Sequence, residues 1–192
     1  MDLLEIMAGR RSVRRYQERE VPRELLEELL TAACWAPSAD NAQPWYFVVL
    51  TQPEDIQALG ATMERVSEEI RPHLESIFPN HPRVVARTTA FLRRLGGAPV
   101  YVLAFLQKDY GAEVRDSMVE SVAAAIQNFL LVAHDRGLGA CWVNAATTLG
   151  YGDALRQQFA PDKGEFISII SLGYPSHKTM APPRKPGRWE IR

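Results

Sequence analysis

Apolar residues recur with helical spacing in three stretches of the chain. Residues 22–35 begin with a proline and place leucine and alanine side chains on one stripe, as in an amphipathic helix. A second helix is predicted from Thr51 and a third from Ser117, because each of these residues begins a four-residue capping-box pattern. The third helix is expected to end at Gly137, since glycine readily adopts the left-handed conformation that terminates helices.

The third predicted helix carries apolar side chains around nearly its whole circumference, which is typical of a buried central helix. Short runs rich in β-branched and aromatic residues alternate with the helices, and glycine, proline or asparagine bounds them. This alternation indicates an α+β class, with a small mixed or antiparallel sheet around the central helix. The predicted strands are residues 45–51, 99–106, 140–144 and 166–173.

Two segments differ from the rest of the chain. Residues 65–97 are polar, rich in arginine and interrupted by prolines, so we expect broken helices near the surface that cover a pocket. Residues 174–192 hold prolines at short intervals, a composition that favours an extended arm over a packed helix. With 192 residues and no internal repeat, the chain is expected to form a single domain, residues 1–192, that ends in this arm.

Composition narrows the possible functions. The chain has 22 basic and 23 acidic residues and a net charge of −1, so no overall field favours nucleic acid or an anionic membrane. Cys34 and Cys141 form no C-x-x-C pair and the histidines are scattered, which disfavours a metal site and dithiol chemistry. We interpret both cysteines as core residues. The chain lacks an apolar run of membrane-spanning length and a signal-peptide pattern, so a cytoplasmic protein is expected.

The sequence RRSVRR at residues 10–15 is the first candidate binding motif. In an extended backbone, Arg10, Ser12 and Arg14 share one face and offer two guanidinium groups and a hydroxyl to one anion. This geometry suits phosphate, because each guanidinium group donates two parallel hydrogen bonds. For an arginine run alone, the simpler interpretation is a solvated basic patch.

The sequence PSADNAQPW at residues 37–45 is the second candidate motif. It joins a helix to a strand, and an ordinary loop would use its serine and asparagine in turns. In a binding site, its hydroxyl and amide groups would suit the edge of a planar heterocycle. Trp45 and Trp142 are interpreted as packing residues as readily as ring-stacking ones.

These two motifs resemble the nitroreductase family in order and spacing when taken with GLGACW at 137–142 and with LGYP and PRKP at 172–175 and 183–186. The resemblance implies an α+β FMN-binding fold and an intertwined homodimer. It also implies hydride transfer from NAD(P)H through FMN to a small organic acceptor, such as a nitroaromatic compound or a quinone. No catalytic side chain is expected, because flavin carries the chemistry while the protein binds and orients it.

The resemblance assigns FMN-binding roles by position. Arginines near the start and in the tail would hold the phosphate, and the polar loop would meet FMN partly from the opposite subunit. Residues 142–144 would lie on the far side of the ring, with a backbone N–H near flavin N5, although Val-Asn-Ala-Ala at 143–146 departs from the family's usual Gly-Gly or Glu-Gly. The assigned residues are Arg10, Arg11, Ser12, Arg14, Pro37, Ser38, Ala39, Asn41, Gln43, Trp142, Val143, Asn144, Arg184 and Lys185.

Other functions remain open at this point. The same fold would serve flavin fragmentation, reductive dehalogenation or heterocycle dehydrogenation, and a non-enzymatic FMN-binding protein would bind flavin without turnover. A nucleic-acid-binding module built on the arginine run is disfavoured by the near-neutral charge and by the lack of a nucleic-acid motif.

Overall fold

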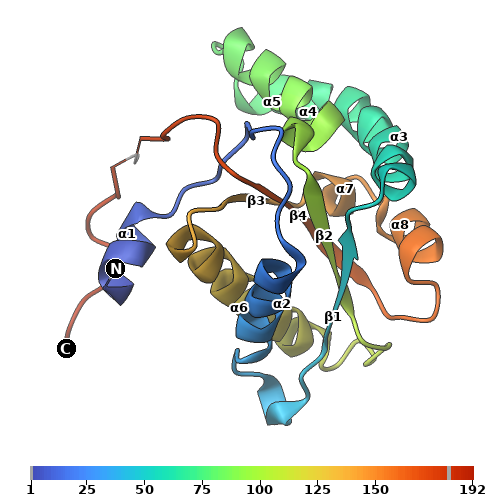
Figure 1. The fold of residues 1–192 in the computed structure, drawn as a ribbon, viewed down its shortest axis with the longest axis vertical. Coiled ribbons are helices and arrows are strands. Elements are labelled where there is room, and N and C mark those ends of the chain that lie inside the picture. The colour runs from blue at the N-terminus through green and yellow to red at the C-terminus, as the bar shows by residue number, and fades with distance from the viewer. Residues whose placement is uncertain (1, 181–182) are drawn as a thin grey trace.

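An antiparallel sheet with the strand order β1-β2-β4-β3 forms the centre of the molecule (Figure 1). The computed structural model describes residues 2–180 and 183–192. The four predicted strands are confirmed, and the sheet that they form is antiparallel rather than mixed. They are β1 (Trp45–Leu50), β2 (Val100–Leu106), β3 (Gly139–Val143) and β4 (Phe166–Gly173).

Helices cover both faces of this sheet (Figure 1). On one face lie α2 (Arg23–Cys34) and the long α6 (Arg115–Asp135). The other face is covered by α3 (Pro53–Glu69), α4 (Arg71–Ile77), α5 (Pro82–Arg94), α7 (Ala145–Thr148) and α8 (Gly152–Phe159). The remaining helical segments are α1 (Leu3–Gly9) and the 3₁₀ turns η1 (Ala39–Asn41) and η2 (Leu95–Gly97).

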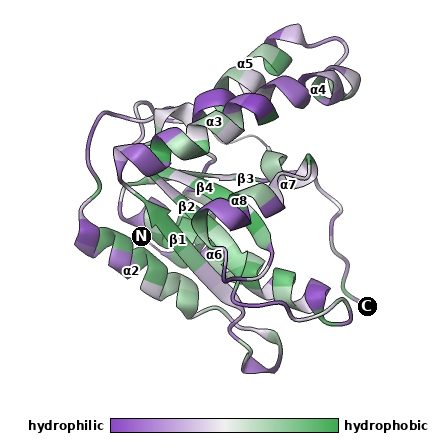
Figure 2. Ribbon diagram, turned by 90° about the vertical axis from the view of Figure 1, so that its right-hand side faces the viewer, coloured by the Kyte–Doolittle hydropathy of each residue, from purple (hydrophilic) through white to green (hydrophobic). Residues whose placement is uncertain are grey.

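The two layers follow from the alternation of side chains along each strand. On β2, Val102 packs into the apolar cluster with α2 and α6, whereas its neighbour Leu103 packs into the cluster with α3, α5 and α8. Both side chains are almost fully buried. Burial of one such side chain stabilises the fold by about 1.5–3 kcal/mol. Figure 2 shows the same division, with apolar strands at the centre and more polar helices outside.

Helix α6 ends as the sequence predicts but begins earlier. The Gly137 N–H donates to the His134 carbonyl (3.1 Å) and the Leu138 N–H to the Ala133 carbonyl (2.8 Å), which is a Schellman ending with Gly137 at φ 76°. At the other end, the predicted capping box at Ser117 is wrong. The helix begins at Arg115, and Ser117 lies inside its first turn.

The predicted capping box at Thr51 is also wrong. Helix α3 begins at Pro53, with Gln52 before it, and no side chain caps the first turn. The proline explains the shift, because its fixed φ and missing N–H suit the first helical position.

One side of α6 is less buried than its all-round apolar pattern predicts. Val122, Ile126 and Phe129 are fully buried against the sheet and α2, whereas Ala123 and Leu131 stay half-exposed. The physical reason is that a single chain supplies a covering layer on one side of this helix only.

Residues 65–97 form broken helices, as predicted, and both α4 and α5 have a proline in their first turn. They are less superficial than expected, because Leu74, Val85 and Leu92 are buried. After Tyr174 the described parts of the tail contain no helix or strand (Figure 1), and residues 175 and 177–179 of the tail line a cavity together with Gly9 at the end of α1. Across the residues described here, no helix combines the length and apolar character needed to cross a membrane.

The two cysteines differ in their surroundings. Cys141 on β3 is buried, as predicted, but Cys34 at the end of α2 is exposed, so its assignment to the core was wrong. Cys34 falls on the outer side of the last helical turn, while Ala33 beside it is fully buried. Apolar neighbours in the sequence therefore did not indicate burial there.

Candidate functional site

The arginine-rich segment lies along the open edge of β3. Ser12 forms a parallel bridge with Ala140, and the Val13 N–H donates to the Ala140 carbonyl (3.0 Å). Gly139 permits this approach, because a Cβ there would lie 2.6 Å from the Val13 side chain. The segment is therefore fixed to the sheet edge in an extended conformation.

The side chains of Arg10, Ser12 and Arg14 gather around the Cys141 thiol. Burial raises the pKa of Cys141, while the Arg14 guanidinium, a hydrogen bond with Ser12 and the Arg10 guanidinium oppose that shift. Ser12 and Arg14 are thus linked to Cys141 by hydrogen bonds, whereas Arg10 also lines a cavity together with Arg11 and Val13. The raised pKa keeps the thiol protonated, which argues against Cys141 as a nucleophile.

A cavity of about 170 Å³ opens where this segment meets the end of α6 and the base of the tail. The buried Nε of Arg11 has no hydrogen-bond partner among the described residues. The Arg11 Nη1 donates to the Arg10 carbonyl oxygen. An unpaired buried donor is costly unless a ligand or water completes it. The cavity is lined by Gly9, Arg10, Arg11, Val13, Leu130, His134, Leu138, Ala140, Pro175, His177, Lys178 and Thr179.

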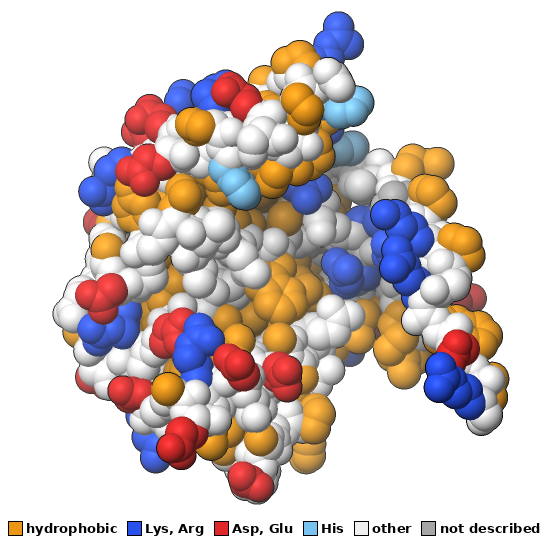
Figure 3. Space-filling model, turned by 180° about the vertical axis from the view of Figure 1, so that it is seen from behind, with side chains coloured by type: hydrophobic (Ala, Val, Ile, Leu, Met, Phe, Trp, Pro, Cys, Tyr) orange, Lys and Arg blue, Asp and Glu red, His pale blue; other side chains and the backbone are white. Residues whose placement is uncertain are grey.

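The charge beside this cavity is positive. Burial lowers the pKa of Arg10, and the neighbouring guanidinium groups of Arg11 and Arg184 lower it further. The tail residue Arg184 therefore lies within electrostatic reach of the arginine-rich segment, although 174 positions separate it from Arg10. Figure 3 shows Lys and Arg side chains beside the hollow between the arm and the body. Lys185 is exposed in the same part of the tail.

His134, in the last turn of α6, is a site residue that the sequence analysis missed. It lines the cavity, and a Cβ on Gly9 would lie 2.7 Å from its Nε2. Burial lowers the pKa of His134, and Arg10 and Arg11 lower it further. The sequence held one usable signal for this residue. His134 lies three residues before Gly137, the predicted helix end, and GLGACW, a motif of the predicted site, starts at that glycine.

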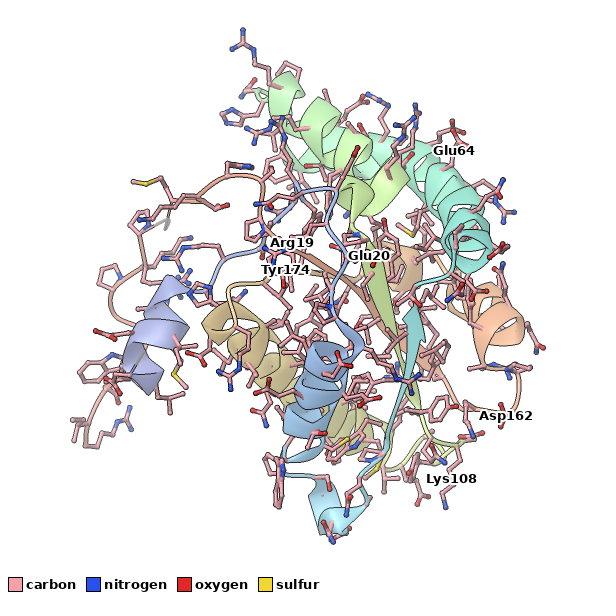
Figure 4. The ribbon with its side chains drawn as sticks, viewed as in Figure 1. Arg19, Glu20, Glu64, Lys108, Asp162 and Tyr174 are labelled. Carbon is pink, nitrogen blue, oxygen red and sulfur yellow. The ribbon has the colours of Figure 1, made fainter. Side chains whose placement is uncertain are left out.

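The base of the tail is fixed above the cavity. The Gln17 N–H donates to the Tyr174 carbonyl (2.9 Å), and the Ser176 N–H donates to the Arg15 carbonyl (3.1 Å). The Arg19 guanidinium carbon lies 3.7 Å from the centre of the Tyr174 ring (Figure 4). These contacts direct the tail back toward the arginine-rich segment.

The polar loop at 37–43 has an unusual backbone. Asp40, Asn41 and Gln43 have φ of 51°, 53° and 45°, although none is glycine. A positive φ at a residue other than glycine lowers the stability of the fold by about 1–3 kcal/mol, and such residues are found disproportionately at functional sites. The Gln43 N–H donates to Ser38 Oγ (3.0 Å), and the Gln43 Nε2 donates to Asn41 Oδ1 (3.2 Å). Pro37 and both amide side chains are exposed.

Within one chain, this loop and the arginine-rich segment lie far apart. The Ala39 N–H donates to Ser121 Oγ (3.2 Å) near the start of α6, whereas the arginines meet His134 near its end. Those two α6 positions are separated by about 20 Å along the helix, at 1.5 Å per residue. The structure therefore does not bring the two predicted halves of the site together.

The third predicted segment lies at the far end of β3 from the arginines. Trp142 is half-buried with its Nε1 lacking a partner in the described chain, Val143 is buried, and Asn144 is exposed before α7. Because the Ala140 carbonyl points away from β4, strand alternation turns the backbone of Trp142 toward the same open edge. Trp45 is buried in the core and acts as a packing residue.

The fold and the cationic sheet edge define an α+β protein with a candidate site for an anionic ligand. The nitroreductase family model matches residues 7–174, and the chain belongs to that family.

Relatives and solved structures agree with this assignment. A protein of Methanothermobacter thermautotrophicus, named as a candidate NADH dehydrogenase/NAD(P)H nitroreductase, is 34% identical over 181 residues, which cover 92% of this chain and 78% of that protein. Iodotyrosine deiodinase 1 of Sus scrofa is 30% identical over 196 residues, which cover 96% and 66%. A candidate nitroreductase from Desulfovibrio desulfuricans, solved in complex with FMN, has a TM-score of 0.69 at 29% identity and covers 97% of this chain and 93% of its own.

Proposed function

We propose that this protein is an FMN-dependent oxidoreductase that transfers hydride from NAD(P)H through FMN to a small organic acceptor, such as a nitroaromatic compound or a quinone. The observation that carries the proposal is the pair Arg10 and Arg11 at one cavity, where the buried Arg11 Nε lacks a partner in the described chain and Arg184 lies within electrostatic reach of Arg10. Like charges so placed repel one another, and a phosphate between them would reverse that cost. Family membership and the FMN in the Desulfovibrio desulfuricans structure support the same cofactor.

The chain's residues fit FMN along the edge of β3. Arg10, Arg11, Arg14 and Arg184 would hold the phosphate, with Lys185 nearby, and Ser12 would meet the adjoining part of the cofactor. Trp142, Val143 and Asn144 would meet the ring, since Asn144 lies about 13 Å along the strand from Ala140, at about 3.3 Å per residue. When bound, FMN supplies the hydride chemistry, and the protein supplies orientation and a local field.

A homodimer would complete the site with Pro37, Ser38, Ala39, Asn41 and Gln43 of a second copy. The distance between this loop and the arginines within one chain supports that arrangement. Exposed apolar side chains support it as well, since contiguous patches of this kind mark interfaces. They lie on α1 and in the tail and include Leu4, Met7, Trp189 and Ile191, and the half-buried Leu131 lies on the open side of α6.

The test begins with the visible spectrum of the purified protein. We expect a flavin spectrum, release of FMN rather than FAD on denaturation, and oxidation of NADH or NADPH when a nitroaromatic compound or a quinone is added. Colourless protein that cannot be reconstituted with FMN would overturn the proposal. The cytoplasmic location is part of the same proposal, and cell fractionation with an antibody to the protein tests it.

Reductive dehalogenation is a second candidate function, favoured by the 30% identity with iodotyrosine deiodinase 1. Iodide release from halogenated tyrosines with dithionite as reductant would separate it from nitroreduction. Protein that binds FMN but turns over no acceptor would instead indicate a non-enzymatic flavin-binding role.

A further inference from the structure

Helix α5 carries a row of exposed arginines. Arg83, Arg87 and Arg94 are separated by four and seven residues, so they lie on one side of the helix and extend over about 16 Å. Phe91 borders this side, and Leu92 on the opposite side is buried. We call these three residues the α5 arginine row.

The α5 arginine row adjoins the candidate FMN site. The Arg14 guanidinium carbon lies 5.6 Å from the centre of the Phe91 ring. Directly after the helix, a Cβ on Gly96 would lie 2.6 Å from the Arg14 carbonyl oxygen, and Gly96 has φ 76°. The carboxyl end of α5 is therefore held against the segment that would bind the cofactor, and the amino end extends away from it.

The three side chains of the α5 arginine row lack acidic partners. In the described chain no carboxylate lies within 4.0 Å of their nitrogens. Arg93 on the same helix shows the contrast, because its guanidinium group lies 3.9 Å from Glu64 and 3.8 Å from Glu68 on α3 (Glu64 is labelled in Figure 4). An unpaired cationic row beside a cofactor site, in a chain of net charge −1, indicates an elongated anionic ligand.

We infer that the α5 arginine row binds the phosphates of the electron donor and makes NADPH the preferred donor over NADH. This inference rests on the proposed function, because it assumes that a nicotinamide dinucleotide reduces FMN at this site. FMN has a single phosphate, which Arg10, Arg11 and Arg184 would already hold. The donor is longer and carries a pyrophosphate in its middle, and NADPH has a further phosphate on the ribose farthest from the nicotinamide.

The position of each arginine along α5 determines which phosphate of the donor it would bind. Arg94 lies nearest the cofactor segment and would meet the pyrophosphate, which NADH and NADPH share. Arg83 and Arg87 lie farther along the helix and would meet the 2′-phosphate, which NADPH alone carries. Each guanidinium group would donate paired hydrogen bonds to a phosphate.

The experiment compares R83A/R87A, R94A and the matched control R93A in the FMN-loaded protein. We expect R83A/R87A to raise the KM for NADPH and the Kd for NADP⁺ roughly tenfold, since the groups are exposed, with NADH little changed. R94A should raise the KM for both donors, and R93A should change neither. The wild-type preference should shrink as salt rises, because exposed charges are screened.

Equal effects of R83A/R87A on both donors, or a wild type that prefers NADH, would overturn the inference. The proposed function would survive either result, because the wild type would still contain flavin and turn over. Failure of the proposed function would look different, because the wild type would then lack FMN or oxidise neither donor. Direct titration with NADP⁺ still measures the α5 arginine row in that case. An NADP⁺ affinity that does not change in R83A/R87A would overturn the inference in either case.

Discussion

The two cavities at the ends of α6 are lined by arginines with opposite pairing. At its carboxyl end, Arg10 and Arg11 have no carboxylate partner in the part of the chain that the structure describes. At its amino end, Arg115 binds Glu165 through two hydrogen bonds (2.6 and 2.7 Å), and Arg156 binds Asp153 (2.7 Å). These paired arginines line a much larger cavity of about 730 Å³.

This difference separates the candidate anion site from the larger cavity by the pairing of its arginines, which neither cavity size nor net charge reveals. A bidentate ion pair has already used the guanidinium donors, so a ligand at the amino end would have to break it. In the cavity at the carboxyl end, no described carboxylate pairs with Arg10 or Arg11, and the buried Arg11 Nε has no partner in the described chain. A net charge of −1 conceals both arrangements, because it sums over paired and unpaired groups alike.

Removal of the tail should have the largest effect on flavin binding at the carboxyl end of α6. A chain truncated after Pro175 loses Arg184 and the apolar residues Trp189 and Ile191. We expect it to lose most of its flavin and to shift from dimer toward monomer, because in the proposed site one segment would serve both the phosphate and the interface. Flavin absorbance and light-scattering mass of both chains measure this, with circular dichroism to confirm folding.

Two outcomes would contradict that expectation. A full-length monomer with stoichiometric flavin would refute a shared site, and a truncated dimer with full flavin would exclude the tail from the site.

Single arginine replacements should have the next largest effect. R10A or R14A should weaken FMN binding by roughly 1.5–3 kcal/mol, the usual scale of a charge-assisted hydrogen bond. The affinity for riboflavin, which lacks the phosphate, should change little in either variant. The matched control is R115A at the other end of α6, which should leave FMN affinity unchanged. Titration of apo-protein with each flavin measures this, and equal losses for FMN and riboflavin would mean that the arginines act through folding.

The sequence predicted the fold better than it predicted the shape of the site. The extended backbone expected at residues 10–15 lies along β3, and the Gly137 stop was correct. Both depend on local backbone geometry, which short patterns encode directly. The capping boxes failed because Ser and Thr followed by an acidic residue also occur one or two positions away from a true helix start.

Long-range features had no equally local signal. His134 reaches the arginines only because α6 is packed so that its last turn meets Gly9. Cys34 is exposed because of the side of α2 on which it falls, and its apolar neighbours did not reveal that. The separation of the polar loop from the arginines depends on the length and placement of α6, which only the folded chain establishes.

Subunit mixing should have a smaller but more specific effect. If the loop of one chain completes the arginine site of another, an R10A chain and an N41A/Q43A chain each lack half of every site. In a mixed dimer, one site combines both changes and the other is intact. We therefore expect separately tagged, co-purified heterodimers to bind about one FMN per dimer with near wild-type affinity, whereas each variant homodimer binds weakly. Heterodimers that bind FMN as weakly as the R10A homodimer would contradict the shared site.

The smallest expected effect concerns His134 and pH. Its pKa is lowered in the folded protein by burial and by Arg10 and Arg11, relative to about 6.5 in an unfolded chain. The neutral form is therefore favoured by folding, and its contribution is present above the unfolded pKa and is lost as pH falls below it. Between pH 7 and pH 5, the unfolding free energy of the apo-protein should fall more steeply in the wild type than in H134N. The exposed His73 on α4 supplies the control variant H73N, which should follow the wild type. Urea unfolding at fixed protein concentration measures the slopes. Bound FMN should reduce the difference, because its phosphate would stabilise the protonated imidazole. Parallel slopes for the wild type and H134N would show that folding does not lower the pKa of this histidine.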